Sequence, residues 1–450
     1  MSLPHERQAV LSLALLYIFR MLGLFMVLPV LALSGAHYEG SSPFLLGIAL
    51  GVYGISQALL QVPFGSLSDR FGRKPLIAFG LLLFAAGSIV AASAETIEGL
   101  IAGRMLQGAG AIAGVIMAMV GDLTSTQGRT KAMASIGASI GIAFAVALVI
   151  GPLIASFGGV STIFWVTALL AISGLVVLYS WVPNPVLNHG SGLAQNEAPK
   201  ATIRSLLFDR QLLPLNVGIF TLHCVLMAMF VILPLILLDS LAIAQANHSW
   251  VYLGLLCSAF IAMVPMMIIA ERKGLVKPFV LISILSLSIA LLALAWQFDH
   301  RIWVLFFVWV FFVGFNYLEA SLPSLMSKTV PAASKGAGSG LFSTCQFLGA
   351  ALGGVMGGWL YAHYSFTGVL LGCTLLVILW LMVALGMKIP SKLSRFCVPL
   401  KGQDYGQLAP ELLALPGVEE TIYSREEDAA YLTIDRQRFD QAQLTTMGLG

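Results

Sequence analysis

Long apolar runs, each close to the length of a membrane-crossing helix, fill most of the chain. A helix that spans a bilayer needs about 20 mostly apolar residues. Twelve runs of this kind occur, at residues 9–33, 44–66, 75–94, 97–120, 132–156, 161–182, 212–238, 249–270, 278–297, 302–325, 336–360 and 366–387. The pattern therefore predicts an all-α membrane protein with twelve transmembrane helices.

A polar stretch near residues 184–210 divides the twelve runs into six and six. It is rich in Pro, Gly, Asn and Ser, which are typical of loops and linkers. We therefore expect an N-terminal six-helix half at 1–183, a cytoplasmic linker at 184–211 and a C-terminal six-helix half at 212–388.

Lysine and arginine are distributed unevenly among the predicted loops. Loops on one side carry nearly all of them, as at Arg70, Arg73 and Lys74, whereas the alternate loops carry only Arg301. Cytoplasmic loops of membrane proteins hold this excess of positive charge. The sequence thus predicts a multi-pass protein of the bacterial inner membrane, with the linker and both termini in the cytoplasm.

The chain after Lys388 has short periodic segments in place of long apolar runs. These segments are predicted strands at Phe396–Leu400, Val418–Tyr423 and Ala429–Ile434, a helix at Gln407–Leu415 and a weaker helix at Gln437–Met447. The order βαββα predicts a small α+β, ferredoxin-like domain in the cytosol at 395–450. Its last strand is missing, so we expect an exposed sheet edge.

Composition supports the bilayer as the solvent. Hydrophobic residues make up 58% of the chain, charged residues 10%, and the mean hydropathy is +0.91. Soluble domains carry about 25% charged residues. The net charge of +3 is small and there is no basic stripe, so a nucleic-acid partner is not expected.

Motifs for catalysis and metal binding are missing from the sequence. The five cysteines form no CxxC pair and no Cys/His cluster with metal-ligand spacing; they are Cys224, Cys257, Cys345, Cys373 and Cys397. No phosphate-binding glycine loop or catalytic set of side chains occurs. We expect a protein that is not an enzyme and has no cofactor, driven by a proton gradient or by the gradient of its substrate. Its expected partners are a small-molecule substrate, protons and the lipid bilayer, without a required protein partner.

Two short segments repeat between the halves at an offset of about 204 residues. Residues 69–75 have a counterpart at 271–278, and residues 131–135 align with 335–339. Parallel repeats of this kind place the halves around a pseudo-two-fold axis, with substrate bound near the midplane between them.

Four ionisable side chains lie well inside predicted spans: Arg20, Arg104, His223 and Glu319. A charge at the bilayer centre costs at least about 2.5–3.5 kcal/mol, so each must face protein or water. They fall on the first, fourth, seventh and tenth predicted helices, and these helices occupy equivalent positions in the two halves. We therefore expect them to line a shared central cavity.

Glu319 is the best candidate for proton coupling, because it is the only carboxylate deep in a span and a buried carboxyl group can exchange a proton near neutral pH. A permanent ion pair is the alternative. Arg20 could attract an anionic substrate group, pair with Glu319 or play a structural role. His223 is either a further coupling group or an ordinary buried histidine.

Polar and flexible side chains in the spans are further candidates for the cavity wall. They are Tyr53, Gln57, Gln61, Met227, Met229 and Phe230. The alternative is that they are ordinary core or lipid-facing residues. Methionine would suit a permissive apolar ligand.

One loop identifies the closest family likeness. The segment Gly65–Leu76 resembles the signature between helices 2 and 3 of the major facilitator superfamily; its diagnostic residues are Gly65, Asp69, Arg70, Gly72, Arg73 and Lys74. The resemblance implies a cytoplasmic latch made by Asp69, Arg73 and Asp122. It also implies that Asp69 faces the positive end of the helix near Gly336 and so holds the outward-open state.

Two further segments carry the resemblance. Gly103–Ala111 looks like the helix 4 motif of the family, whose arginine, here Arg104, is implicated in proton coupling. Gly151 and Pro152 match part of the antiporter signature of helix 5, although Ala147 stands where a glycine is expected. Small residues at these positions permit close helix packing.

Taken with the C-terminal module, the chain looks most like the drug:proton antiporter branch. We expect a proton-coupled exporter of amphiphilic or drug-like small molecules that works by alternating access. An uptake carrier or facilitator for a metabolite would use the same scaffold. A membrane sensor whose C-terminal module reports a bound ligand is the third reading.

Overall fold

The chain forms two compact units, residues 1–387 and 388–450. The computed structural model describes residues 4–124, 126–183, 203–296, 300–330, 335–387, 393–400, 404–424, 429–435, 439–440, 443–444 and 449. The first unit holds both predicted six-helix halves, and most of the predicted linker lies outside the described residues.

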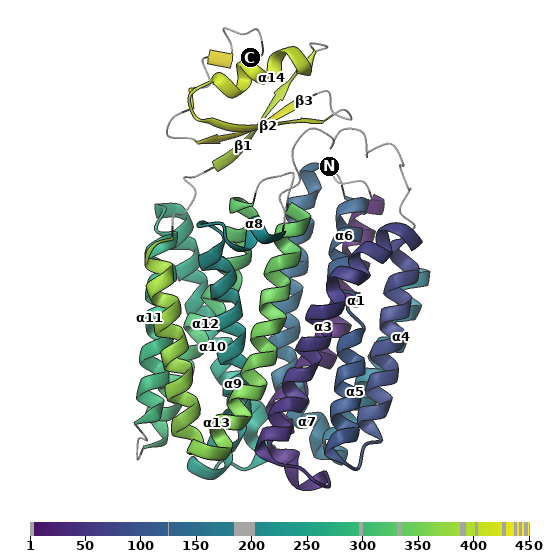
Figure 1. Ribbon diagram of the computed structural model, residues 1–450, viewed down its shortest axis with the longest axis vertical. Helices are drawn as coiled ribbons and strands as arrows, with labels where there is room; N and C mark the ends of the chain where they lie inside the picture. The colour runs from purple at the N-terminus through teal and green to yellow at the C-terminus, as the bar shows by residue number, and fades with distance from the viewer. Residues whose placement is uncertain are drawn as a thin grey trace. The chain divides into compact units, whose positions relative to one another are not determined.

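Helices α1 to α7 build the N-terminal half (Figure 1). Their bounds are α1 Pro4–Phe25, α2 Leu28–Leu31, the 3-10 helix η1 Ala32–His37, α3 Pro43–Phe71, α4 Arg73–Ala92, α5 Ile97–Ala109, α6 Ala113–Leu123 and α7 Thr126–Ser180. Local signals set the ends of α3. The Ser42 hydroxyl accepts a hydrogen bond from the amide of Leu45, Pro43 occupies the first turn, and Gly72 ends the helix at φ +95°.

Helices α8 to α13 build the C-terminal half. Their bounds are α8 Ile203–Leu207, α9 Leu213–Leu235, the π-helix η3 Ile236–Ser240, the 3-10 helix η4 Gln245–Asn247, α10 His248–Lys273, α11 Val276–Ala295, α12 Arg301–Thr329 and α13 Lys335–Leu385. The short helix α8 lies inside the stretch predicted as linker.

Twelve crossings follow from ten long helices. Within the described residues, ten helices are long and apolar enough to cross a membrane, and two of them run for 50 and 49 residues. About 20 residues suffice for one crossing. Each of these two helices is broken near its middle, α7 at Gly158 and Gly159 and α13 at Ser365. The predicted twelve-helix architecture is confirmed.

Helix α7 doubles back at its break. The Ser161 hydroxyl, just after the break, donates to the carbonyl of Ala92 at one end of α4. The Lys74 ammonium at the other end of α4 donates to the carbonyl of Val182, just beyond α7, at 2.6 Å. The second part of α7 therefore runs antiparallel to α4, as a separate crossing must.

The fourth crossing differs from the prediction of one continuous helix, because it is split between Ala109 and Ala113. A Cβ on Gly110 would lie 2.4 Å from the carbonyl oxygen of Gly80 in α4. The backbones of the two crossings thus meet at this point. The continuous apolar sequence gives no sign of the break.

The two halves meet closely along α3 and α13. A Cβ on Gly47, Gly51 or Gly54 would lie 2.3, 2.4 or 2.5 Å from a carbonyl oxygen of α13. Small residues allow such backbone contact in a membrane. Further along the same helices, Gly65 and Gly340 have no neighbouring atoms within 4 Å of a Cβ position. The contact is therefore confined to the part of α3 that begins at Pro43.

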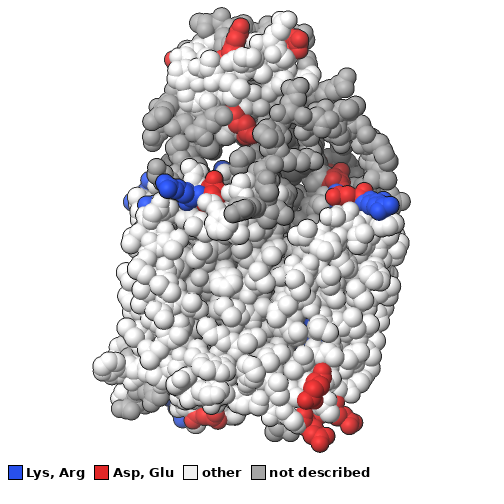
Figure 2. All heavy atoms as spheres, viewed as in Figure 1, with Lys and Arg blue, Asp and Glu red and all other residues white. Residues whose placement is uncertain are grey.

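Charges gather at the ends of the first unit, and its sides are apolar. Figure 2 shows Lys and Arg together with some Asp and Glu around the upper rim, while the lower end shows mainly Asp and Glu. Large apolar side chains are exposed in between, among them Leu59, Leu169 and Ile261. This surface fits a protein solvated by lipid, with the positive rim on the predicted cytoplasmic side.

The second unit contains a three-stranded antiparallel sheet and one helix. Their bounds are β1 Leu393–Pro399, α14 Tyr405–Ala414, β2 Val418–Ser424 and β3 Ala429–Asp435, with strand order β1-β3-β2. Val398, Leu412 and Leu432 lie in its buried core. The three predicted strands and the first helix are confirmed. The predicted helix 437–447 falls mostly outside the described residues, and the ferredoxin-like assignment stays a prediction.

Candidate functional site

Arg20 is buried near the middle of α1, with 1% of its surface exposed. One terminal nitrogen, Nη2, donates to the Tyr53 hydroxyl at 3.0 Å and to Oε1 of Gln57 at 2.5 Å. Tyr53 and Gln57 lie one turn apart on α3, so their side chains point to the same face of that helix. Gln57 in turn approaches Gln61 at 3.4 Å.

Arg104 on α5 is fully buried on the other side of Tyr53. Its guanidinium carbon lies 5.0 Å from the centre of the Tyr53 ring, which is cation–π geometry. It donates to Oε1 of Gln107 at 2.8 Å and to the carbonyl of Ala49 at 3.3 Å. Gln107 then donates to Ser88 at 2.7 Å. We call Arg20, Tyr53, Gln57, Arg104 and Gln107 the arginine cluster.

The arginine cluster contains two cations and only neutral partners. Among the described residues, neither guanidinium forms an ion pair with a carboxylate. Arg20 keeps Nε and Nη1, and Arg104 keeps Nη2, without a hydrogen-bond partner. Buried charge is normally paired. The absence of a described carboxylate partner for either guanidinium is therefore an unusual feature of this site.

The C-terminal half holds a second polar group, formed by His223, Glu319 and Gln346. Nε2 of His223 lies 3.7 Å from a carboxylate oxygen of Glu319 and 2.8 Å from the side-chain amide of Gln346. Nδ1 of His223 lies 3.2 Å from the carbonyl of Ile219. His223 is 7% exposed, and the side chain of Glu319 is 28% exposed. We call these three residues the histidine–glutamate site.

Aromatic rings from both halves meet between these helices. Phe144 of α7 lies 5.0 Å from Phe25 of α1, 6.3 Å from Phe230 of α9 and 6.0 Å from Phe315 of α12, measured between ring centres. The Phe315 ring is also 6.4 Å from the His223 ring. This aromatic cluster gives the interface between the halves a large apolar surface next to the histidine–glutamate site.

The four ionisable residues predicted to share one cavity thus occur as two pairs. Arg20 and Arg104 meet at Tyr53, and His223 faces Glu319. The Arg20–Glu319 pair that the sequence left open is not formed, because the described ion-pair partner of Glu319 is His223. Of the other cavity candidates, Met227, Met229 and Phe230 are buried in α9.

The predicted latch residues lie together at the cytoplasmic end of α3, α4 and α6. Arg73 contacts Asp69 at 2.5 Å and Asp122 at 2.9 Å. It also donates to the Ser68 hydroxyl at 2.6 Å. The Arg73 side chain is 16% exposed, whereas that of Asp69 is 66% exposed. A single guanidinium therefore joins three crossings of the N-terminal half.

The other latch residues surround this contact. Gly72 forms the sharp turn between α3 and α4, and Arg70 stacks on Phe71 with its guanidinium 5.6 Å from the ring centre. Lys74 is tied to Val182. Gly65 lies one turn before Asp69 on α3, and Gly336 lies in the first turn of α13. The approach of Asp69 to that first turn stays a prediction.

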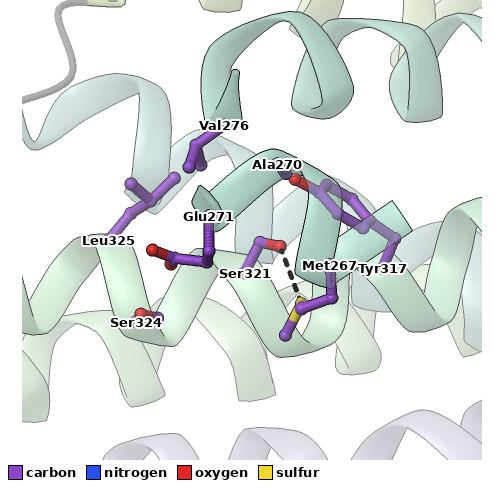
Figure 3. A pocket seen from close by; sticks show the side chains of 8 residues that line it. All are labelled: Met267, Ala270, Glu271, Val276, Tyr317, Ser321, Ser324 and Leu325. Atoms are coloured by element: carbon purple, nitrogen blue, oxygen red, sulfur yellow. Dashed lines mark hydrogen bonds between the residues drawn. The ribbon is translucent and has the colours of Figure 1, made fainter. Parts of the chain in front are cut away.

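A small pocket lies at the corresponding place in the C-terminal half, between α10 and α12 (Figure 3). Glu271 at its rim pairs with Lys328 at 3.1 Å, and Ser321 points its hydroxyl at the sulfur of Met267. Both charged side chains are about half exposed, at 57% and 49%. In the repeat of the latch, the exposed Glu271–Lys328 pair thus differs from the largely buried Arg73 contact of the N-terminal half.

Gly151 and Pro152 lie in the first part of α7, against the end of α1. A Cβ on Gly151 would be 2.3 Å from the carbonyl oxygen of Met26. Ala147, one turn earlier, is fully buried. Close packing at the helix 5 signature is therefore retained despite the alanine.

Sequence reasoning did not single out Gln346, Phe144 or Gln107 as parts of the site. Gln346 and Gln107 are uncharged polar residues inside apolar runs, and the same criterion that selected Gln57 would have found them. Phe144 carries no such signal, because phenylalanine is abundant in the spans. Within the described part of the chain, no group of three or more His, Cys, Asp or Glu could hold a metal ion.

Comparison with known proteins adds a family match over both halves. A model of the Major Facilitator Superfamily matches residues 13–264 and 218–402. The chain is 44% identical over 438 residues to the inner membrane transport protein YajR of Escherichia coli (strain K12), covering 96% of this chain and 95% of that protein. It is 34% identical over 350 residues to the uncharacterized transporter BU466 of Buchnera aphidicola subsp. Acyrthosiphon pisum, covering 77% and 89%.

Solved structures show the same fold at low identity. A D-xylose-proton symporter superposes with a TM-score of 0.67 at 15% identity, over 84% of this chain and 97% of that one. The human organic anion transporter MFSD10 gives 0.63 at 17% identity, over 85% and 100%. At these identities the likeness concerns the fold alone.

Proposed function

Because the chain belongs to the Major Facilitator Superfamily, we propose that it is a proton-coupled secondary transporter that exports amphiphilic or drug-like small molecules by alternating access. That it is a multi-pass inner-membrane transporter rather than an enzyme follows from its relatives. The observation that carries proton coupling is the arrangement of His223, Glu319 and Gln346.

The histidine–glutamate site offers two hydrogen-bonding states. With neutral His223, Nδ1–H donates to the Ile219 carbonyl and Nε2 accepts from the amide of Gln346. Nε2 then has no proton to share with Glu319. When His223 binds a proton, Nε2–H becomes a donor, and Glu319 at 3.7 Å is its charged acceptor. Protonation thus replaces Gln346 by Glu319 as the partner of the ring.

This exchange reaches the interface between the halves through α13. Gln346 is followed by Phe347, and the Phe347 carbonyl lies against Gly54 of α3. Phe347 also belongs to the buried core cluster that contains Tyr53. A change in the partner of Gln346 therefore acts on the helix that closes over the N-terminal half, which is a two-state element of the kind that alternating access requires.

The latch and the aromatic cluster supply the other parts of the proposal. Arg73 holds α3 to α6, so it stiffens the N-terminal half as one moving body. The aromatic cluster gives an amphiphilic substrate an apolar contact from both halves. Proton binding at His223, with Glu319 as its charged acceptor, and substrate binding would then compete through the same closure.

Uptake of a metabolite is the second candidate. It is favoured by the partly exposed Glu319 beside the buried His223, because this pair would serve a symporter equally well. A D-xylose-proton symporter shares the fold. The sensor reading rests only on the separate C-terminal unit. Export is preferred because the cavity candidates around the aromatic cluster are apolar and would bind a permissive range of ligands.

Substrate-induced proton release from the purified protein tests the proposal. The probes are ethidium, chloramphenicol and 1-naphthoate, which are a cation, a neutral compound and an anion, added in weak buffer with a pH indicator. We expect release of protons with at least one probe and its loss in Glu319→Gln. Glu98→Gln, an exposed carboxylate in the first turn of α5, is the matched control and should keep the release. Release that persists in Glu319→Gln would refute coupling at this residue.

A further inference from the structure

The arginine cluster has a buried positive charge and no described carboxylate to balance it. We propose that Arg20 binds the negatively charged group of the substrate, and that the substrate is an organic anion with an aromatic or other apolar body. The inference deepens the proposed transport function and rests on it.

The protein partners of Arg20 are too few and of the wrong charge for a purely structural role. Only Nη2 is hydrogen bonded, to the neutral Tyr53 and Gln57, and both Nε and Nη1 are buried without a partner. Arginine does not lose its charge in proteins. A buried guanidinium left in this condition is costly unless an anion joins it during the working cycle.

Arg104 strengthens the case, because it adds a second positive charge a short distance away. Its guanidinium lies on the face of Tyr53, whose hydroxyl accepts from Arg20. Its Nη2 also lacks a partner. Two uncompensated cations around one tyrosine produce a strongly positive interior in the N-terminal half. A carboxylate, sulfonate or phosphate group would be attracted there, and a cationic ligand would be repelled.

The apolar body of the substrate is indicated by the neighbourhood on α1. Phe25 follows Arg20 by five residues, and its ring contacts Phe144 of the aromatic cluster. Phe144 in turn meets Phe230 and Phe315 from the C-terminal half. A ligand with its anion at Arg20 and its ring system toward Phe25 would touch both halves, as the substrate of an alternating-access carrier must.

The described conformation is sealed at this site. Arg20 and Tyr53 are each 1% exposed, and Phe347 of α13 packs into the same core cluster as Tyr53. The carbonyl of Phe347 lies against Gly54, so the contact of α3 with α13 holds Phe347 in this core. Separation of α3 from α13 would uncover the cluster, so the site would load in the state in which these helices part.

A matched series of ligands separates charge from shape. The probes are 1-naphthoate, 1-naphthamide and 1-naphthylmethylammonium, which share a ring system and carry negative, zero and positive charge. Binding is measured on the purified full chain in detergent, from the rise in unfolding temperature with ligand concentration. Unfolding is followed by reaction of the buried Cys224 and Cys373 with a thiol-reactive fluorophore, after the exposed Cys257 and Cys397 have been blocked in the folded protein.

We expect stabilisation by 1-naphthoate alone. In Arg20→Gln its apparent Kd should rise about tenfold or more, because a charge-assisted hydrogen bond is lost. Arg20→Lys, which keeps the charge, should retain a preference for the anion. Arg7→Gln is the matched control on the same helix, since Arg7 lies in the exposed first turns of α1, and it should bind as the unmodified protein does.

Three results would overturn the proposal. Equal stabilisation of the protein by naphthoate and naphthamide would show that the site does not recognise the negative charge of the ligand. Unchanged naphthoate affinity in Arg20→Gln, with the variant folded and monodisperse, would remove Arg20 from the site. The third result concerns an inorganic anion. If chloride raises the unfolding temperature more than gluconate does, this effect needs Arg20, and naphthoate has no effect, then the anion at Arg20 is a structural inorganic ion.

This binding test needs no proton gradient, so it fails independently of the coupling proposal. Naphthoate binding should persist in Glu319→Gln, where proton release is lost. If proton release occurs with ethidium or chloramphenicol and naphthoate never binds, coupling stands and the anion site falls. If naphthoate binds through Arg20 and no probe releases protons, the anion site stands without coupling.

Discussion

The two halves of the transporter share one architecture and carry opposite kinds of polar group. The N-terminal half buries Arg20 and Arg104, whose charge is fixed, among neutral partners. The C-terminal half holds His223 and Glu319, both of which can gain or lose a proton, beside Gln346. Fixed charge suits recognition of a ligand, and titratable charge suits exchange of protons. We infer that the halves divide these tasks.

The same contrast recurs at the cytoplasmic ends. In the N-terminal half Arg73 is largely buried and contacts two carboxylates, and in the C-terminal half Lys328 forms one open pair with Glu271. The two halves therefore share the positions of charge near the loops and not the contacts. A position that is equivalent by symmetry need not have an equivalent role.

The largest effect is expected where the two halves touch. In Gly51→Leu the new side chain would meet the Ala351 carbonyl, since even a Cβ would lie 2.4 Å away. The approach of α3 to α13 would be lost at the point where Phe347, which shares a buried core cluster with Tyr53, has its carbonyl against Gly54. We expect transport to fall to background, measured as uptake into proteoliposomes, and a lower unfolding temperature.

Gly254→Ala is the control for this variant. Gly254 lies on α10 with nothing within 4 Å of a Cβ position, and alanine favours a helix over glycine. It should keep full transport. If Gly51→Leu transports at the normal rate, the contact between α3 and α13 does not connect the two polar groups.

The fold was largely predictable because the bilayer imposes a length on each helix. Apolar runs therefore gave the twelve crossings, and the bias of lysine and arginine gave their orientation. The split between Ala109 and Ala113 was not predictable, since apolar sequence continues through it. It depends on the approach of Gly110 to Gly80, which is a tertiary contact.

The site was predictable in its members and not in its grouping. Charge inside an apolar run identified Arg20, Arg104, His223 and Glu319. Which of them meet depends on how the helices rotate and pack, and 123 residues separate His223 from Gln346. The sequence consequently suggested one shared cavity, whereas the packing makes two polar groups.

A moderate effect should distinguish the cytoplasmic ends. Arg73→Gln removes the guanidinium that joins Asp69 to Asp122, so we expect a several-fold lower transport rate in proteoliposomes. Lys328→Gln breaks an exposed pair, and exposed pairs contribute only about 0–1 kcal/mol. It should leave rate and unfolding temperature nearly unchanged. Equal losses in the two variants would argue that both ends act as latches.

The smallest effect, and the finest test of the contrast, concerns Tyr53. Tyr53→Phe removes the hydroxyl that accepts from Arg20 and keeps the ring under Arg104. The loss of one such hydrogen bond amounts to about 1–3 kcal/mol, so the unfolding temperature should fall by a few degrees. Tyr53→Leu also removes the ring face and so loses the cation–π contribution of about 0.5–2 kcal/mol to stability. Its unfolding temperature should therefore lie below that of Tyr53→Phe.

These two variants also report on the ligand. An anion at Arg20 would compensate for the missing hydroxyl, so 1-naphthoate should stabilise Tyr53→Phe by more degrees than it stabilises the unmodified protein. Matched scans at one heating rate, with and without naphthoate, measure the difference. If the tyrosine only fills space between α3 and α5, the increments will be the same, and the arginine cluster will be a structural network whose charge serves no ligand.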